Sequence, residues 1–269
     1  MVFDQFYTKN QIAKKYYQKL IEKKNINIFD YIIEPSAGKG AFFNLLPTDK
    51  RIGIDIDPKC DNIIKIDFFD YDIPNGNICF IGNPPFGKNS SLAIQFFNKC
   101  AKYGTCIAFI IPRTFKRVSV QNQLDPYFHL IHSSDLPLKP CCFEPNMDAK
   151  CCFQIWEKRF EKRAKVVLPK THEDFHFLKW GPLDINGQPT PPIGAHFAMK
   201  AYGSNCGQIV EEGLEELRPK SWHWIVSNID MELLKERFQQ LDYSISKDTV
   251  RQDSIGQQEL IMLYMERFG

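Results

Sequence analysis

Short apolar segments alternate with longer amphipathic segments between Asp30 and about Arg159. This alternation is typical of strands and helices that are joined as βαβ units. The apolar segments contain few polar residues, as expected of strands that are buried on both faces of a sheet. They predict strands at residues 31–34, 52–56, 63–66, 78–82, 106–111, 130–133 and 151–156.

The amphipathic segments predict helices. Because neighbouring parallel strands need long crossover connections, the order of strands and helices predicts an α/β fold with a doubly wound, mostly parallel sheet. The helices are expected at residues 11–23, 40–46, 91–101 and 118–124.

The pattern changes after Arg159. Lys and Glu dominate residues 157–165, and a Pro/Gly-rich stretch follows at residues 186–194. We therefore expect a boundary near residue 165, with one domain at residues 1–165 and a small α+β region at residues 166–269. Within this second region, the pattern predicts strands at residues 195–202 and 222–226 and helices at residues 231–240 and 257–267.

Composition limits the classes of protein to consider. A chain of 269 residues with 43% hydrophobic residues is long enough for one substantial core and a smaller second one. Its net charge is only +2, so affinity for a polyanion must come from local patches. No window approaches the roughly 18 apolar residues that span a bilayer, and the first residues lack the apolar stretch of a signal peptide. These features predict a soluble, intracellular, cytoplasmic protein without a membrane partner.

The nine cysteines include two adjacent pairs, Cys141-Cys142 and Cys151-Cys152. Zinc knuckles use a C-x-x-C spacing, which is missing here. Adjacent residues of a strand also point to opposite faces of the sheet. We expect no metal site.

A small-residue turn follows the first predicted strand of the sheet, in the segment Glu34-Pro35-Ser36-Ala37-Gly38-Lys39-Gly40. Small residues let the backbone approach a ligand closely, and a following helix would favour a negatively charged or acceptor group. The segment is not a phosphate-binding P-loop, because it lacks the four-residue spacer and the Ser or Thr after Lys39. An ordinary strand-to-helix connection is an equally good interpretation of this turn alone.

Two further predicted strands end in a carboxylate. Asp55, followed by Ile56, lies roughly twenty residues after the glycine turn, where an acid in such sheets accepts hydrogen bonds from ribose hydroxyls. Asp67 precedes Phe68, a combination suited to the amino group and ring face of adenine. Either acid alone is equally consistent with a solvated strand end. The carboxyl ends of consecutive parallel strands are, however, where these sheets bind ligands.

The tetrapeptide Asn83-Pro84-Pro85-Phe86 follows the most apolar predicted strand. The two prolines stiffen the turn and remove two backbone donors. The Asn83 side-chain oxygen and the Pro84 carbonyl can then accept hydrogen bonds from one amino group, and Phe86 offers a face for stacking on a base. A conjugated amino nitrogen is a poor nucleophile until such bonds pull it toward tetrahedral geometry. The segment therefore indicates methyl transfer to an exocyclic amino group.

These motifs resemble those of adenine-specific amino-methyltransferases that use S-adenosyl-L-methionine, a group with a Rossmann-like fold. The resemblance covers roughly residues 4–160 and includes residues 4–8, similar to a leading motif of the family, and residues 153–156, similar to its last antiparallel strand. It implies that Asn83, Pro84, Pro85 and Phe86 form the catalytic motif. It also implies a cofactor site made of Tyr7, Thr8, Glu34, Pro35, Ser36, Ala37, Gly38, Gly40, Asp55, Ile56, Asp67, Phe68 and Asn83.

Adenine in DNA, reached by base flipping, is the target that the resemblance favours. Adenine in RNA is the main alternative, and an inactive methyltransferase-fold subunit is another. Enzymes that methylate a glutamine side chain of release factors carry Tyr in place of Phe86. Residues 166–269 match no recognition domain, and a homodimer or a partner subunit both stay open. Basic residues at 113–117, and aromatic and basic residues between Lys179 and Trp224, predict contacts to nucleic acid, although the aromatic residues equally suit a small core.

Overall fold

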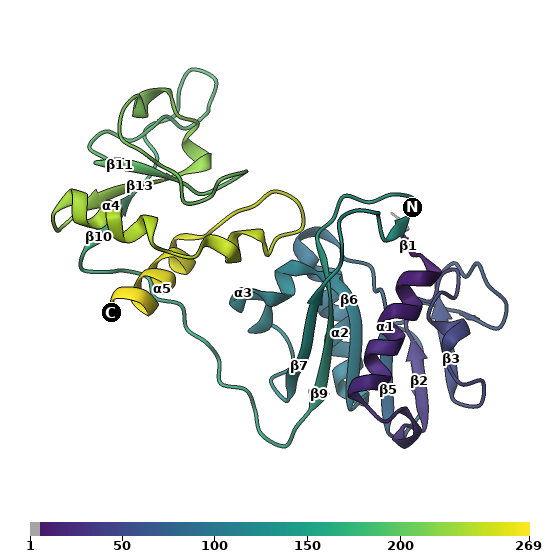
Figure 1. Cartoon of the computed structure of the whole chain (residues 1–269). Helices are drawn as coiled ribbons and strands as arrows, with labels where there is room; N and C mark the ends of the chain where they lie inside the picture. Colours follow the sequence, from purple (N-terminus) through teal and green to yellow (C-terminus); the bar gives the residue numbers. More distant parts are fainter. Residues whose placement is uncertain (1–5) are drawn as a thin grey trace. The chain divides into compact units, whose positions relative to one another are not determined.

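A computed structural model describes residues 6–269, which divide after Lys165 into two compact units. The first unit is built on a seven-stranded sheet with the strand order β4-β3-β2-β5-β6-β9-β7 (Figure 1). Its strands are β2 (Tyr31–Glu34), β3 (Arg51–Asp55), β4 (Ile64–Lys65), β5 (Ile78–Gly82), β6 (Cys106–Pro112), β7 (Phe128–Asp135) and β9 (Cys151–Lys158).

The strands from β4 to β6 are parallel, and β9 is antiparallel to both of its neighbours. In the centre of the sheet, Ile33 of β2 lies between Ile52 of β3 and Phe80 of β5. Every residue of β5 and β6 is buried, which explains their uninterrupted apolar sequence. The α/β class, the mostly parallel sheet and the last antiparallel strand are confirmed.

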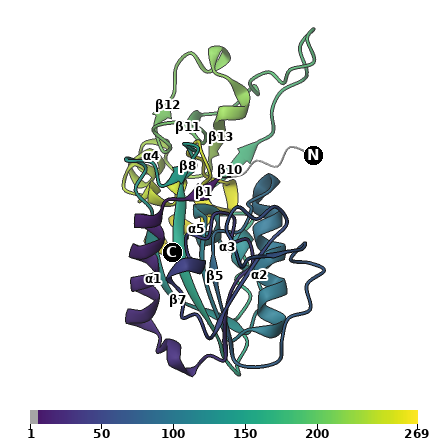
Figure 2. The same ribbon diagram turned by 90° about the vertical axis from the view of Figure 1, so that its right-hand side faces the viewer.

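Helices cover both faces of this sheet (Figures 1 and 2). On one face, α1 (Asn10–Lys23) places Tyr16 against Phe153 of β9, with ring centroids 4.7 Å apart. On the other face, α2 (Ser91–Tyr103) places Phe97 against Trp156 of the same strand, with centroids 5.5 Å apart. Because Phe153 and Trp156 lie on opposite faces of β9, one strand anchors both helical layers.

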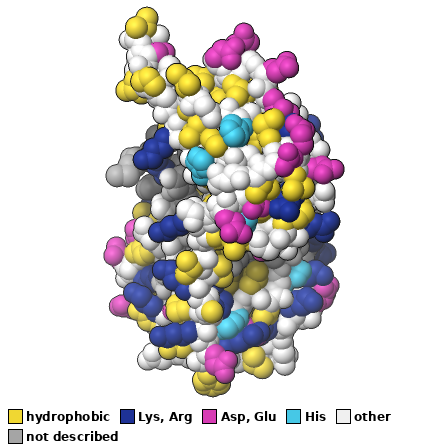
Figure 3. All heavy atoms as spheres, turned by 90° about the vertical axis from the view of Figure 1, so that its left-hand side faces the viewer, with side chains coloured by type: hydrophobic (Ala, Val, Ile, Leu, Met, Phe, Trp, Pro, Cys, Tyr) yellow, Lys and Arg dark blue, Asp and Glu magenta, His cyan; other side chains and the backbone are white. Residues whose placement is uncertain are grey.

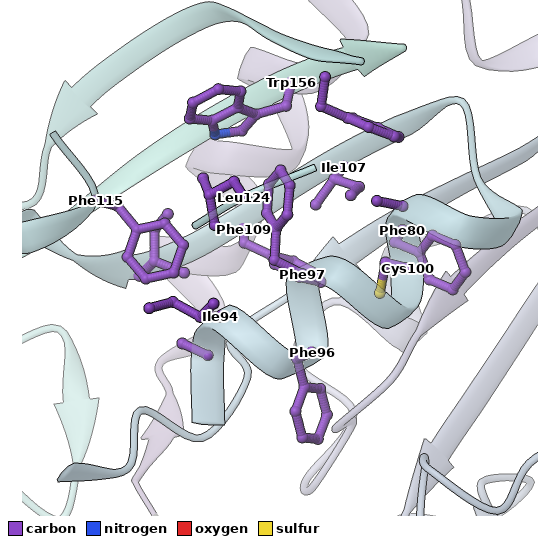
Figure 4. Close-up of a cluster of buried hydrophobic side chains, with 14 of the residues drawn as sticks. Phe80, Ile94, Phe96, Phe97, Cys100, Ile107, Phe109, Phe115, Leu124 and Trp156 are labelled. Atoms are coloured by element: carbon purple, nitrogen blue, oxygen red, sulfur yellow. The ribbon is translucent and has the colours of Figure 1, made fainter. Parts of the chain in front are cut away.

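The core between α2 and the sheet is shown in Figure 4. Ile94, Phe97 and Cys100 recur at the spacing of one helical face and point toward the sheet, where they meet Phe80 and Phe109. Phe97 and Cys100 are completely buried. This packing fixes α2 against the middle of β5 and β6, so that the loop between β5 and α2 joins two firmly packed elements.

Two predicted helices are wrong in extent or type. Residues 40–46 form turns and only a 3₁₀ helix at Phe43–Leu45, because Gly38 and Gly40 have φ angles of +48° and +76° that no α-helix accommodates. The backbone N–H of Phe43 also donates to the Glu34 carboxylate instead of a helical carbonyl. In the second case α3 is only Val118–Gln121, and turns continue to Leu124.

The second unit, Val166–Gly269, has a four-stranded antiparallel sheet in the order β10-β13-β11-β12. One face is covered by α4 (Met231–Gln239) and α5 (Gln257–Phe268) (Figure 1), with Ile225, Phe238 and Tyr264 in the core between them. The small α+β region is confirmed, although two of its strands, β10 and β12, were not predicted. The strands are β10 (Phe175–Leu178), β11 (Phe197–Lys200), β12 (Ile209–Val210) and β13 (Trp222–Ser227).

Short elements complete the chain. Two-residue strands β1 (Tyr7–Thr8) and β8 (Phe143–Glu144) pair with each other and were not predicted. None of the nine cysteines forms a disulfide, and residues 6–269 hold no group of three or more His, Cys, Asp or Glu side chains that could bind a metal ion. In the same range no helix has the length and apolar character needed to cross a membrane. The other 3₁₀ helices are Ile26–Ile28, Lys88–Ser90, Arg113–Lys116, Leu214–Glu216, Pro219–Ser221 and Tyr243–Lys247.

Candidate functional site

The centre of the first sheet contains a topological switch point. β2 and β5 are parallel neighbours, but the chain leaves β2 toward β3 on one side and leaves β5 toward β6 on the other. Loops that diverge in this way leave a crevice at the carboxyl ends of the two strands, where open α/β sheets bind their ligands. The turn beginning at Glu34 and the tetrapeptide beginning at Asn83 both follow these ends.

The two loops contact each other directly. The Ser36 hydroxyl donates a hydrogen bond of 3.1 Å to the backbone carbonyl of Asn83. Gly82 has a φ of +153°, and a Cβ atom there would lie 3.1 Å from Cγ of Glu34. The structure therefore brings together two motifs that lie almost fifty residues apart in the sequence.

Gly38 forms the centre of the first loop. Its backbone N–H donates to Oδ2 of Asp55 at 2.7 Å, and its carbonyl accepts from the N–H of Lys59 at 2.8 Å. A Cβ atom on Gly38 would lie 2.8 Å from the ring of Tyr7, and the φ of +48° adds strain for any larger residue. Glycine is therefore required here by the close approach of Tyr7 from β1.

Asp55 ends β3 beside this loop. Its two carboxylate oxygens accept backbone N–H groups from Gly38 at 2.7 Å and Asp57 at 2.8 Å. These bonds hold the carboxylate in one orientation, and each oxygen keeps a second acceptor position for a ligand hydroxyl. The next residue, Ile56, leaves 45% of its surface exposed, so an apolar side chain lies at the rim beside the acid.

Glu34 is buried at the end of β2, and its Oε2 accepts the N–H of Phe43 at 2.7 Å. Burial raises the pKa of this carboxyl well above its ordinary value of 4.5, and the nearby charge of Asp55 raises the pKa further. The hydrogen bond from Phe43 acts in the opposite direction but is the smaller effect next to burial. In its neutral form such a carboxyl group can donate a hydrogen bond as well as accept one.

Asn83 occupies the corner of the second loop. Its Nδ2 donates to the backbone carbonyl of Phe6 at 3.3 Å, whereas its Oδ1 is buried and has no hydrogen-bond partner. The hydroxyl oxygen of Thr8 in β1 is likewise buried and unsatisfied. Buried polar atoms in native proteins are almost always paired, so these two atoms are acceptors to which a bound water or ligand could donate.

The rest of the tetrapeptide is anchored at both ends. Pro84 is buried, Pro85 is exposed and the ring of Phe86 is partly exposed. The Phe86 carbonyl accepts the N–H groups of Leu92 at 3.2 Å and Ala93 at 3.3 Å at the start of α2. The tetrapeptide is thus held between β5 and α2 by backbone bonds, and the Phe86 side chain takes no part in them.

The loop after β4 contains Asp67 and Phe68. Oδ1 of Asp67 accepts the N–H of Phe69 at 2.9 Å. The Phe68 ring lies in the core, stacked on Phe96 with centroids 5.1 Å apart, so it does not offer an open face as the sequence suggested. Sequence reasoning overlooked Lys99 of α2, whose ammonium donates to the Phe68 and Phe69 carbonyls at 2.5 and 2.7 Å and fixes this loop.

Residues 113–117 were expected to contact a nucleic-acid backbone, but two of their basic side chains have partners within the protein. The Arg113 guanidinium donates to the Leu136 carbonyl at 3.3 Å and pairs with Asp135 at 3.4 Å. Lys116 pairs with the same carboxylate. Near the N-terminus, Asp4 and Gln5 of the motif at residues 4–8 lie outside the described residues. The structure describes Tyr7 and Thr8, the two residues of this motif that were predicted to bind the cofactor.

No protein-family model and no curated protein matches the chain.

Several solved structures are similar to it in part. A Pyrococcus horikoshii protein provisionally described as an RNA methyltransferase is 16% identical, over 58% of this chain and 87% of its own, with a TM-score of 0.44. The 23S rRNA methyltransferase ErmE is 14% identical, over 60% of this chain and 72% of its own, with a TM-score of 0.44. A dimethyladenosine transferase from Plasmodium falciparum is 16% identical, over 58% of this chain and 64% of its own, with a TM-score of 0.41. The fold assignment rests on the strand order and not on these weak similarities.

Proposed function

We propose that the chain is an S-adenosyl-L-methionine-dependent methyltransferase that modifies the exocyclic amino group of adenine in DNA. The observation that carries this proposal is the unpaired Oδ1 of Asn83 within the Asn83–Phe86 tetrapeptide, next to a glycine loop at the switch point of the sheet. The resemblance of both motifs to those of adenine-specific amino-methyltransferases supports the same reaction.

The residues around the crevice fit the cofactor. The orphaned Thr8 hydroxyl and the close-packed Gly38 turn suit the amino-acid end, Asp55 suits the ribose, and the loop at Asp67 suits the adenine amino group. When bound, S-adenosyl-L-methionine supplies an electrophilic methyl group on a sulfonium. The residues that we assign to its binding are Tyr7, Thr8, Glu34, Pro35, Ser36, Ala37, Gly38, Gly40, Asp55, Ile56, Asp67, Phe68 and Asn83.

Phe68 contributes to this set through its backbone and through the packing of its loop, because its ring is buried in the core. Ile56, which follows Asp55 and is partly exposed, is better placed than Phe68 to cover an adenine ring. This division of roles follows from burial alone and changes the assignment made from the sequence.

The chain's own contribution to the reaction is to orient and polarise the target amino group. Oδ1 of Asn83 and the Pro84 carbonyl accept its two hydrogens, which reduces conjugation of the nitrogen lone pair with the ring and makes the nitrogen a better nucleophile. Phe86 stacks on the base. No strong base is required, since the methylated amine loses its extra proton after transfer. Pro85 stiffens the corner and keeps the two acceptors in a fixed relation.

A target base within a duplex must leave the helix to reach such a crevice. We assign residues 166–269 to target recognition, as the part of the chain that would hold the flanking strand. This assignment separates chemistry in the first unit from recognition in the second.

Transfer of a tritiated methyl group to unmethylated DNA, to transcribed RNA and to protein, measured in parallel, tests the proposal. Label in DNA that is recovered as N6-methyladenine after digestion supports it. Label in RNA alone would show that the polymer assignment is wrong, and label in protein alone would overturn the substrate class. Cofactor binding by calorimetry without transfer to any of the three polymers would indicate a binding subunit without enzymatic activity.

A further inference from the structure

The second unit contains a groove of about 690 Å³ that is lined only by its own residues. Its floor is formed by the end of β10 and by Trp222 and His223 of β13. One wall is the segment at Tyr202, which bridges to Ser254, and the other begins at Trp180. We refer to the surface formed by Lys179, Trp180, Tyr202, Lys220, Trp222 and His223 as the aromatic groove.

A hairpin, residues 181–191, positions Trp180 on the wall. The Gly181 N–H donates to the Thr190 carbonyl at 2.8 Å, and a Cβ atom at Gly181 would lie 2.7 Å from the Pro191 carbonyl. Glycine is therefore needed for the two strands of the hairpin to approach each other directly after Trp180. The hairpin bears exposed apolar side chains, including the fully exposed Ile185. Figure 3 shows a projecting segment at the upper left whose side chains are mostly hydrophobic.

The aromatic residues of the groove fall into two classes. Trp222 is buried and packs with Trp224 in a small cluster, which is a structural role. Trp180 and Tyr202 leave 51% and 49% of their surfaces exposed while lining a concave surface. Large half-exposed rings in a groove are typical of binding surfaces, because their apolar faces gain free energy when a flat partner covers them.

The charge of the groove selects the partner. Lys179 and Lys220 line it, and none of its lining residues, all within residues 177–257 of the described chain, is Asp or Glu. The Lys220 ammonium lies 6.0 Å from the centre of the Trp180 ring, so a positive charge accompanies the most exposed ring.

His223 does not contribute to this charge. Burial lowers its pKa to about 4, although its hydrogen bond to the Ile255 carbonyl acts in the opposite direction. The ring is therefore neutral near pH 7, and the lysines carry the positive charge of the groove.

We propose that the aromatic groove binds single-stranded nucleic acid, with unpaired bases stacked on Trp180 and Tyr202 and the flanking phosphates near Lys179 and Lys220. Stacking platforms beside basic side chains bind single strands with little sequence preference. A groove lined by no carboxylate does not repel the phosphate backbone. An unpaired base has lost its stacking neighbours, and the exposed rings of the groove can replace them. The site is independent of the crevice in the first unit.

Fluorescence anisotropy with a labelled short oligothymidylate, its oligouridylate counterpart and an abasic oligonucleotide of the same length tests this site on the full chain. We expect Trp180→Ala to weaken binding of both base-containing strands about 5- to 150-fold, the range for loss of one stacking contact. Binding of the abasic strand should not change. Tyr103→Ala is the matched control, since this ring at the end of α2 is 46% exposed but lies outside the groove.

Lys220→Ala should weaken binding of all three strands. The slope of log affinity against log salt concentration should also become shallower by about 0.7, the value for one lost phosphate contact on a single strand. Lys170→Ala, an exposed lysine outside the groove, should leave both quantities unchanged. Equal affinity of the wild-type chain for the abasic and base-containing strands would overturn the proposal. Unchanged binding after both Trp180→Ala and Tyr202→Leu would do the same.

Failure of this proposal can be distinguished from failure of the proposed reaction. Asn83→Ala should bind oligothymidylate like the wild type. If the wild-type chain binds single strands through Trp180 but transfers no methyl group, the proposed groove is supported and the proposed reaction is contradicted. If the wild-type chain transfers methyl groups but Trp180→Ala binds single strands as tightly as the wild type, the proposed reaction is supported and the proposed groove is contradicted.

Discussion

The two units of the chain differ in how closely their surfaces follow local sequence. In the first unit, most residues of the crevice come from short segments at the ends of β2, β3 and β5, and the backbone there requires particular residues such as Gly38. In the second unit, the aromatic groove combines Trp180, Tyr202 and Lys220 from three separate segments with no recognisable motif. Chemistry that depends on backbone geometry leaves a readable sequence pattern, whereas a binding surface made of side chains does not.

The largest effects should come from breaking the two cores separately. Phe97 and Phe238 are completely buried in the first and second core respectively. Replacing either by Ala should lower the free energy of unfolding of its own unit by about 3–5 kcal/mol, because a large cavity is left behind. Hydrogen exchange should then increase in α2 for Phe97→Ala and in α5 for Phe238→Ala. Equal loss of protection in both units with either variant would show that they unfold as one.

The next largest effect concerns catalysis in the first unit. Asn83→Ala removes the buried, unpaired acceptor that we assign to the target amino group, and should lower kcat by about 100- to 1000-fold. Cofactor affinity measured by calorimetry should fall far less than kcat, because the other residues that we assign to cofactor binding keep their contacts. Asn77→Ala, just before the other end of β5, is the matched control and should retain kcat. Joint loss of transfer and cofactor binding in Asn83→Ala would contradict a role in orienting the target.

A smaller effect is expected for cofactor binding. Asp55→Ala removes a charged acceptor and should weaken cofactor affinity roughly 10- to 100-fold, the range for charge-assisted hydrogen bonds. Asp57→Ala is the control for loss of a nearby carboxylate. The Asp57 carboxylate pairs with Lys59 at 2.7 Å, so the Asp57→Ala variant should bind the cofactor with wild-type affinity. Equal dissociation constants for wild type and Asp55→Ala would remove the ribose assignment.

The smallest effect should come from Glu34. Because burial raises the pKa of this carboxyl above 4.5, the folded chain binds a proton that the unfolded chain releases, and wild-type stability declines as pH rises toward the pKa of the folded state. Glu34→Gln has no such titration and keeps an acceptor for the Phe43 N–H. The melting temperature of Glu34→Gln relative to wild type should therefore increase with pH above 4.5. Parallel curves across that range would show that the carboxyl titrates normally.

Sequence patterns were most informative where burial is complete. The strands around Ile33, Phe80 and Phe109 were located within one or two residues, because strands with two buried faces are continuously apolar. They were least informative for residues 40–46, where an apolar segment with helical spacing follows two glycines of positive φ. The pairing of Tyr7 with Glu144 was also missed, since strands of two residues have no detectable periodicity.

The candidate site was only partly predictable for a related reason. The order of motifs placed Glu34, Asp55 and Asn83 at strand ends, and parallel topology brings such ends to one edge of a sheet. It could not indicate which way a ring would turn, so Phe68 was expected in the crevice although its ring lies in the core. Nor could it indicate that the Arg113 side chain is held by Asp135.

The amino-acid sequence by itself determined the α/β class, the positions of the buried strands and the chemistry available at their ends, because these depend on residue type and short-range spacing. Only the tertiary structure decided which groups meet: the Ser36 hydroxyl on the Asn83 carbonyl, and the half-exposed Trp180 and Tyr202 in the lining of one groove. The reason is physical. Hydrophobic patterning specifies which face of an element is buried, whereas contacts between distant segments depend on how several elements pack at once.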